Sequence, residues 1–571
     1  MVVGRKVISI TNFIAMNDAS AESARMGKIG RRKFLVTGGS AALAFALISL
    51  ARRREVAALG PLGALVPDPD QVLDLPEGFQ YEILESKGEA MDDRYRVPGR
   101  PSGMACFPGS NGTLILMRNH EVSVGDHDDG PYAPGQDPSA QAYETAGMGG
   151  VTRLVIDASS YARISSNLVL VGTARNAGGG VSPWGWLSCE SDTEIGGGVR
   201  HGYVFRCPAD AAGVKAPQRV DGYGRFRHAA ACVDPSNNYV YLTENRTDSC
   251  LYRFVPNNAL DPFTGTLQAL AVVNIDGYET DDMSEDQVLE IHWVTIAHPD
   301  PDADTVREQG HSKGAARFVR GEGIWFHEGQ VYFCARRGGE AGIGQIFRLI
   351  DGESKTLELI LASSDAGVLD SPDALTVAPW GDVFMSEDGD GDQYIRWIDG
   401  FGAVRDFARN AKSSGELSGV CFSPDAKALF VNMQADGLTL VITGPFPMVA
   451  PEPGDGGGDD EGDGGDEGDG EGSGEGHGDG DGDGDDQGAD EGESGADESG
   501  DFGDELGEDG DAGDAGDAGS GPYIDYDRAR LGYLDDCNCT SEAADDPGLA
   551  IAGTVAAALA VRAHLVRPDE S

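Results

Sequence analysis

Gly103-Met-Ala-Cys-Phe107, followed by Thr113-Leu-Ile-Leu-Met117, reads as a strand, a turn and a second strand, and it closes with Asn119-His120-Glu121. Short apolar runs bounded by Gly, Asn, Asp and Pro are typical of β-strands joined by turns. Residues 73–447 contain few stretches with the spacing of an amphipathic helix. The sequence therefore predicts an all-β fold for this region.

The same strand–turn–strand unit recurs along the chain and usually ends in polar residues. Four further copies span residues 229–244, 323–337, 374–388 and 419–434, and residues 184–189 form a degenerate sixth copy. Unevenly spaced strand pairs of this kind are typical of a β-propeller, in which blades repeat around a central channel. About six blades are expected.

The polar residues at the strand ends predict a site on the propeller axis. Equivalent ends of equivalent strands point to the same end of the axis, so Glu244, Glu322 and Glu387 or Asp388 should converge there with Cys189. A single Glu at a strand end is ordinary turn chemistry. Clustered carboxylates, however, repel one another unless a cation compensates them, so the set favours a cation site.

The stretch Gly178-Gly-Gly-Val-Ser-Pro-Trp-Gly-Trp-Leu-Ser-Cys189-Glu190 places a thiol beside a carboxylate. Together they offer one soft and one hard ligand for a metal such as iron. The alternative is a strand with a buried Cys that acts as a small hydrophobic residue. The nine cysteines show no paired zinc spacing, and Cys189 is our candidate for a free thiol.

Composition separates a second region from this body. Residues 451–521 contain almost only Gly, Asp, Glu, Ala and Ser, with no Lys or Arg, in a chain of net charge −53. Such a segment cannot bury enough apolar surface to fold, so we expect a disordered, extended linker, with weak calcium binding as the alternative. The acidity argues against nucleic acid as a partner.

The N-terminal residues 1–58 read as an export signal. Gly30-Arg-Arg-Lys-Phe-Leu35 precedes an apolar run over residues 36–50, a pattern typical of twin-arginine signals. A plain membrane anchor is the alternative. We expect the twin-arginine export machinery as a partner, and a location in the periplasm or on the outer cell surface.

The C-terminal residues 522–571 form a second addressing segment. Cys537-Asn538-Cys539 is followed by a short apolar run over residues 548–561, which is shorter than the roughly 20 residues of a membrane span. The tail resembles myxobacterial C-terminal sorting tails, which implies a sorting protease as a possible partner. The alternative is a short apolar helix that packs or oligomerises. Membrane contact is expected only through one of the two terminal segments.

A set of short segments within residues 70–447 forms a recognisable pattern. The segments are Arg118-Asn-His-Glu121, Gly149-Gly-Val-Thr152, residues 179–190, Tyr241-Leu-Thr-Glu244, Arg320-Gly-Glu-Gly323, Pro379-Trp-Gly381 with Glu387-Asp-Gly389, Cys421-Phe-Ser-Pro-Asp425 and Ile442-Thr-Gly-Pro445. On these segments, residues 70–447 resemble the PhoX-type alkaline phosphatases. The resemblance implies an exported β-propeller that hydrolyses phosphate monoesters at a centre containing Fe³⁺ and Ca²⁺.

The resemblance also implies roles for single residues. Arg320 would contact phosphate, although a structural ion pair with Glu322 is the alternative. The residues implied as metal ligands are Cys189, which would bind iron, and Glu244, Glu322, Glu387 or Asp388, Asn119, and Glu190 or Glu194. In phosphoryl transfer, metal ions neutralise the phosphoryl oxygens and activate an oxygen nucleophile, and an arginine can stabilise the developing charge.

One departure from the family pattern keeps other functions open. The family usually has His-Glu where this chain has His228-Ala229. Besides a metal-dependent phosphatase, the sequence is therefore compatible with a non-catalytic calcium-binding propeller at the cell surface. A calcium propeller that hydrolyses lactones or sugar esters is a third reading, and it would not need Cys189.

Overall fold

The computed structural model describes residues 62–196, 198–400 and 402–447. The predicted signal region (1–58), acidic linker (451–521) and C-terminal tail (522–571), with its apolar helix, lie outside the described residues. These three assignments stay predictions.

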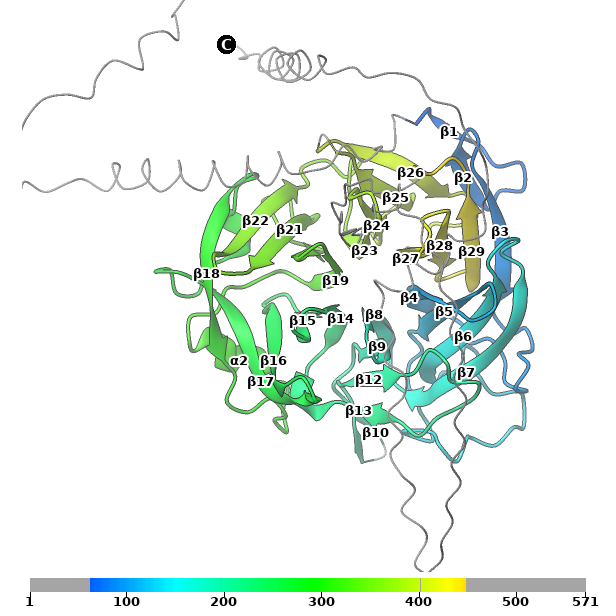
Figure 1. Ribbon diagram of the computed structural model, residues 1–571, viewed down its shortest axis with the longest axis horizontal. Helices are drawn as coiled ribbons and strands as arrows, with labels where there is room; N and C mark the ends of the chain where they lie inside the picture. The colour runs from blue at the N-terminus through cyan, green and yellow to red at the C-terminus, as the bar shows by residue number, and fades with distance from the viewer. Residues whose placement is uncertain (1–61, 197, 401, 448–571) are drawn as a thin grey trace, which may run out of the picture. The chain divides into compact units, whose positions relative to one another are not determined.

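A ring of inner strands surrounds a central axis (Figure 1). Within the described residues the ring consists of β4(Pro101–Pro108), β8(Asn176–Ser182), β14(His228–Asp234), β19(Gly321–His327), β23(Pro372–Val377) and β27(Leu417–Phe422). Each inner strand contacts the next around the ring, and β27 contacts β4, so the ring is closed. The all-β fold and the propeller arrangement are therefore confirmed.

Antiparallel strands extend outward from each inner strand, and we call each such group a blade. The first blade adds β5(Thr113–His120), β6(Gly149–Asp157) and β7(Arg163–Thr173) to β4. The second adds β9(Gly185–Glu190), β12(Val204–Cys207) and β13(Gln218–Arg219) to β8, with a separate pair β10(Ile195–Gly196) and β11(Val199–Arg200).

The next two blades share one nine-stranded sheet. Outward from β14 run β15(Tyr239–Glu244), β16(Tyr252–Asn258), β17(Asp261–Val272) and β18(Val288–Thr295). Outward from β19 run β20(Gln330–Ala335), β21(Gln345–Asp351) and β22(Lys355–Ala362), and β22 pairs with β18. Because hydrogen bonding does not divide the strands into six separate sheets, the number of about six blades stays a prediction.

N-terminal strands complete the last two blades. β23 is followed outward by β24(Val383–Glu387), β25(Tyr394–Ile398), β26(Val404–Asn410), β2(Leu73–Pro76) and β1(Leu65–Val66). β27 is followed by β28(Ala428–Met433), β29(Leu438–Thr443) and β3(Gln80–Ser86). β3, from the start of the propeller, pairs with β29, from its end, and forms the outermost strand of the last blade. This pairing joins the two ends of the propeller and closes the ring.

Apolar side chains between neighbouring blades form the core. Between the last two blades, Phe384, Phe407, Phe422 and Trp397 are buried together, and the rings of Phe384 and Trp397 stack at 5.9 Å. The short helices α2(Val306–His311), η3(Asp221–Tyr223) and η4(Thr280–Asp282) lie between strands. All seven cysteines in the described part of the chain are free thiols. No helix in this part is long and apolar enough to cross a membrane.

Every inner strand carries a β-bulge near its first residue. The pairing with the second strand shifts between Pro101 and Met104, and equivalently in the other blades between Asn176/Gly179, His228/Ala231, Gly321/Ile324, Pro372/Leu375 and Ser418/Cys421. Inner strands approach closely here. A Cβ on Gly178 would lie 2.6 Å from the carbonyl oxygen of Ala229, so glycine fits where a larger residue would clash. Bulges re-aim side chains, and here they do so at one end of the axis.

Candidate active site

A cavity of about 520 Å³ opens at the bulged end of the axis. The first bulge residue of every inner strand lines it, and we call these residues the bulge ring. Its members are Ser102, Ala177, Ala229, Glu322, Asp373 and Gly419. Two positions, Glu322 and Asp373, are acidic and lie on adjacent inner strands, whereas three positions have no polar side chain. The acidic groups of the ring therefore lie on one side of the cavity.

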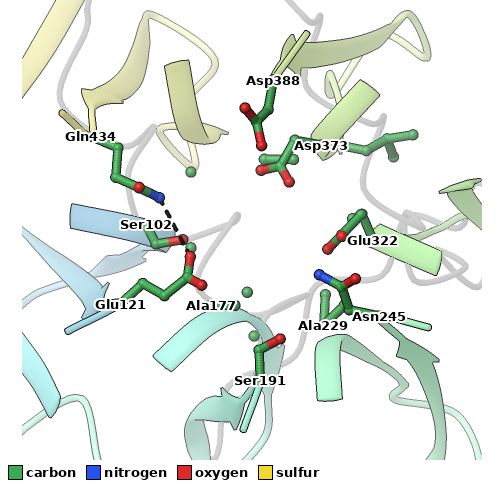
Figure 2. A pocket seen from close by; sticks show the side chains of 18 of the residues that line it. Ser102, Glu121, Ala177, Ser191, Ala229, Asn245, Glu322, Asp373, Asp388 and Gln434 are labelled. Carbon is green, nitrogen blue, oxygen red and sulfur yellow. Dashed lines mark hydrogen bonds between the residues drawn. The ribbon is translucent and has the colours of Figure 1, made fainter. Parts of the chain in front are cut away.

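A second ring consists of the residues that directly follow the second strand of each blade. Each donates its backbone N–H to the carbonyl of the residue before the inner strand, which fixes its position at the cavity. The members of this outer ring are Glu121, Ser191, Asn245, Arg336, Asp388 and Gln434. Figure 2 shows Glu121, Asp373, Asp388 and Glu322 around the open centre, with Gln434 hydrogen-bonded to Glu121 at 3.5 Å.

Four carboxylates lie on neighbouring blades and form what we call the acidic arc: Glu322, Asp373, Asp388 and Glu416. Burial, reinforced by the negative charge of Asp388, raises the pKa of Asp373 to about 7. Burial and Asp373 raise the pKa of Glu322 and of Glu416 well above the ordinary value. Arg336 forms an ion pair with Asp388 and partly offsets this charge.

The acidic arc fits a hard cation. Oε1 of Glu322 is buried and has no hydrogen-bond partner, so it is available as a ligand. Carboxylate oxygens are the ligands that Ca²⁺ prefers. The cavity lining includes no Cys or His. Within the described residues the carboxylates do not form a preassembled cluster of metal-ligating groups.

The structure brings three of the predicted site residues to this cavity: Arg320, Glu322 and Asp388. Arg320 precedes β19 and has a left-handed backbone conformation, with φ 57°. Its side chain makes no hydrogen bond or ion pair with the described residues, so the alternative of a structural pair with Glu322 is not observed there. An unpaired guanidinium in a cavity is available to an anion.

Three predicted glutamates point into their own blades instead. Glu190 accepts hydrogen bonds from His201 at 2.7 Å and from the backbone of Gly202 at 2.9 Å. Glu387 accepts one from Nε of Arg396 at 2.9 Å. Successive side chains of a strand face opposite sides, so the last residue of the second strand is turned away when the following residue faces the cavity.

Glu244 is the third of these glutamates. It accepts a hydrogen bond from the Tyr252 hydroxyl at 2.9 Å and lies 3.6 Å from Arg307. Burial raises the pKa of Glu244 to about 8. Its neighbour Asn245, rather than Glu244 itself, lines the cavity.

Cys189 and Asn119 lie in the protein interior, and Glu194 is exposed away from the cavity lining. Cys189 is fully buried in an apolar cluster, and burial raises the pKa of its thiol. Nδ2 of Asn119 donates a hydrogen bond to the carbonyl of Ala177 at 2.9 Å, and its Oδ1 accepts one from Nε1 of Trp186 at 2.8 Å. The structure thus does not bring the expected thiolate ligand to the cavity.

Three cavity carboxylates were not among the residues selected from the sequence: Glu121, Asp373 and Glu416. Glu121 stands one residue beyond Asn119-His120 in a segment already recognised. Asp373 and Glu416 lie at the start of inner strands, whereas the residues selected from the sequence lie mainly at the ends of second strands. A search for acidic residues at both ends of the strand pair would have found them.

Comparison with known proteins places the chain in a family. A family model described as alkaline phosphatase PhoX matches residues 61–169 and 162–437. The chain belongs to the PhoX family. No curated protein matches the sequence.

One solved structure shares the fold of this PhoX-family chain, and two others match it less well. Pseudomonas fluorescens PhoX in complex with vanadate, a transition state analogue, is 17% identical, with a TM-score of 0.51 over 68% of this chain and 98% of that chain. A gluconolactonase from Xanthomonas campestris is 14% identical, with a TM-score of 0.34 over 68% of this chain and 100% of its own. Virginiamycin B lyase from Staphylococcus aureus is 14% identical, with a TM-score of 0.32 over 64% of this chain and 99% of its own.

Proposed function

We propose that this PhoX-family protein hydrolyses phosphate monoesters in the cavity at the bulged end of the propeller. One observation carries the proposal: the unpaired guanidinium of Arg320 and the acidic arc line the same cavity, with Glu322 two residues from Arg320. A phosphatase needs both a cation site and a donor for phosphoryl oxygens. Membership in a family of alkaline phosphatases supports the same reaction.

Different residues of the cavity would bind the cation and the phosphate group. Glu322, Asp373, Asp388 and Glu416 would hold the cation, and Arg336 keeps Asp388 in place through their ion pair. A cation bound there supplies positive charge that stabilises the phosphoryl oxygens. Arg320 would donate N–H groups to a phosphoryl oxygen as negative charge develops on it.

We propose Ca²⁺ as a resident cation, because the cavity offers oxygen ligands. An Fe³⁺ ion, the other metal implied by the family resemblance, would have to use the same carboxylates. Cys189 is buried in an apolar cluster and is not part of the cavity lining. A thiolate–iron bond therefore has no support from the arrangement of these residues.

A non-catalytic calcium-binding propeller is the second candidate. Its support is Ala229, which departs from the family pattern and occupies a bulge-ring position equivalent to Glu322 and Asp373. Ala177 and Gly419 also contribute no ligand to this ring. The bulge ring therefore offers fewer ligands than a ring with six polar positions, which would suit a binding site as well as a reduced catalytic centre.

Export through the twin-arginine machinery to the periplasm or outer cell surface is part of the proposal. The paired arginines and apolar run within residues 1–58 support it, and the C-terminal residues 522–571 would be the substrate of a sorting protease. Replacing Arg31 and Arg32 together by Lys should keep the protein inside the cell. Cell fractionation that still finds the double variant outside would reject this route.

The direct test is an assay of the full chain, produced in a host with twin-arginine export, using p-nitrophenyl phosphate and elemental analysis. Turnover in protein that contains calcium, or calcium with iron, is expected. Calcium-loaded protein without turnover would favour the non-catalytic binding protein.

A further inference from the structure

Arginines precede the inner strands of four consecutive blades. They are Arg100, Arg175, Arg227 and Arg320, and all four line the cavity. In each case the backbone carbonyl accepts the N–H of the outer-ring residue of the same blade. The four guanidinium groups therefore start from equivalent points around one side of the cavity, next to the acidic arc.

Two of these arginines are neutralised by acidic partners. Nε of Arg100 lies 3.1 Å from a carboxylate oxygen of Asp129. Nη2 of Arg175 lies 2.6 Å from a carboxylate oxygen of Glu121. Their charge is already compensated, so neither needs a ligand.

The side chains of the other two, Arg227 and Arg320, have no hydrogen-bond or ion-pair partner among the described residues. Nε of Arg227 is buried and lacks an acceptor. The acids whose charges act on Arg227 include Asp192 and Asp304, and neither forms a hydrogen bond or ion pair with its side chain. Asp304 forms ion pairs with Arg246 and, at 3.2 Å, with Arg307, and it forms none with Arg227.

Arg227 and Arg320 are held next to each other by one short segment. Asn245 donates its N–H to the carbonyl of Arg227 at 3.0 Å, and the next residue, Arg246, accepts the N–H of Arg320 at 2.8 Å. The strands that follow, β14 and β19, are neighbours in the inner ring. Two arginines whose side chains have no partner among the described residues thus start from neighbouring inner strands and line the same cavity.

We propose that Arg227 and Arg320 form a two-arginine clamp for a tetrahedral dianion, the phosphate group of the substrate. The role of Arg320 in this clamp rests on the proposed function. The clamp adds Arg227 as a second phosphate-binding residue. A guanidinium fork donates two parallel N–H groups to oxyanions, and two forks match a group with several equivalent oxygens. The small residues Ala177 and Ala229 leave space beside the clamp.

Binding of inorganic phosphate to the full chain tests the clamp separately from catalysis. Equilibrium dialysis with radiolabelled phosphate would compare the wild type with Arg227→Ala, Arg227→Lys and Arg320→Ala, with and without added calcium. Arg100→Ala is the matched control, because Arg100 occupies the same position in its blade but is paired with Asp129. Circular dichroism and thermal unfolding would verify the fold of each variant, and Arg227→Gln replaces Arg227→Ala if the latter does not fold.

Arg227→Ala should raise the dissociation constant of phosphate about 10- to 100-fold, the loss expected for a hydrogen bond to a charged group. Lys should restore only part of it, and Arg100→Ala should change it less than about threefold, as for a compensated surface pair. Unchanged phosphate binding in folded Arg227→Ala, or no phosphate binding by the wild type, would overturn the clamp.

Turnover of p-nitrophenyl phosphate, measured in parallel, separates the two proposals. Turnover by the wild type, with phosphate affinity that does not depend on Arg227, would reject the clamp and keep the phosphatase. Phosphate affinity that depends on Arg227, without turnover, would keep the clamp and reject the phosphatase.

Discussion

Glu387 and Asp388 are consecutive residues that serve different parts of the protein. The carboxylate of Glu387 is buried in its blade and accepts a hydrogen bond from Nε of Arg396 at 2.9 Å. The carboxylate of Asp388 faces the cavity and pairs with Arg336 from the neighbouring blade. At the end of this strand, one carboxylate therefore stabilises the blade and the next is available to a cation in the cavity.

Replacing these two residues should therefore have opposite consequences. Glu387→Ala removes the hydrogen-bond acceptor of a buried arginine and should lower the free energy of unfolding by about 1–3 kcal/mol, with calcium affinity little changed. Asp388→Asn should weaken calcium binding at least about tenfold, with a smaller effect on unfolding. Chemical denaturation and calcium titration would measure both, and the reverse pattern would show that the two faces are wrongly assigned.

Cys189→Ala tests whether a thiolate belongs to the metal centre. The buried thiol packs in an apolar cluster, so its loss should cost about 1 kcal/mol of stability through lost contacts. Metal content and phosphatase turnover should stay near those of the wild type. A variant that loses iron, with its fold intact, would instead show that Cys189 is a ligand.

The stability of metal-free protein should fall as the pH rises from about 4 to about 7. Burial raises the pKa of Asp373 to about 7, so in this range the folded state holds a proton that the unfolded state has lost. Urea unfolding in EDTA at pH 5 and pH 8 would measure the difference. Asp373→Asn should flatten it, and added calcium should stabilise the wild type more at pH 8 than at pH 5. A stability that rises over this range and does not depend on Asp373 would contradict the assignment.

Arg320→Ala should reduce phosphatase turnover about 10²- to 10³-fold, the range for loss of one donor to a transition state. Lys should rescue poorly, because an ammonium group cannot reproduce the planar fork of guanidinium. Calcium content and the thermal unfolding temperature should stay close to the wild type, since the side chain has no partner among the described residues. Unchanged turnover would make Arg320 a structural residue.

The fold could be predicted from the sequence because strand–turn–strand units recur and end in polar residues. The exact site could not, because the sequence does not show where each strand pair ends or that every inner strand is bulged. One residue of shift exchanges the two faces of a strand, so Glu190 and Glu244 were selected where Ser191 and Asn245 face the cavity. For the same reason the sequence left the choice between Glu387 and Asp388 open, and Asp388 is the one that faces the cavity. Arg320 and Glu322 were found because their segment resembles a family motif. Cys189 was selected because a thiol beside a carboxylate suits a metal, but its strand is buried on both faces.

The calcium dependence of turnover in wild-type protein and in Glu322→Gln tests the central claim most directly. Glu322 carries a buried oxygen without a partner and starts the acidic arc. Wild-type protein stripped with EDTA should be inactive on p-nitrophenyl phosphate and regain saturable turnover as calcium is added. Glu322→Gln should need at least about tenfold more calcium or stay inactive. Equal turnover of both proteins at every calcium concentration, including none, would contradict a cation-dependent phosphatase at this cavity.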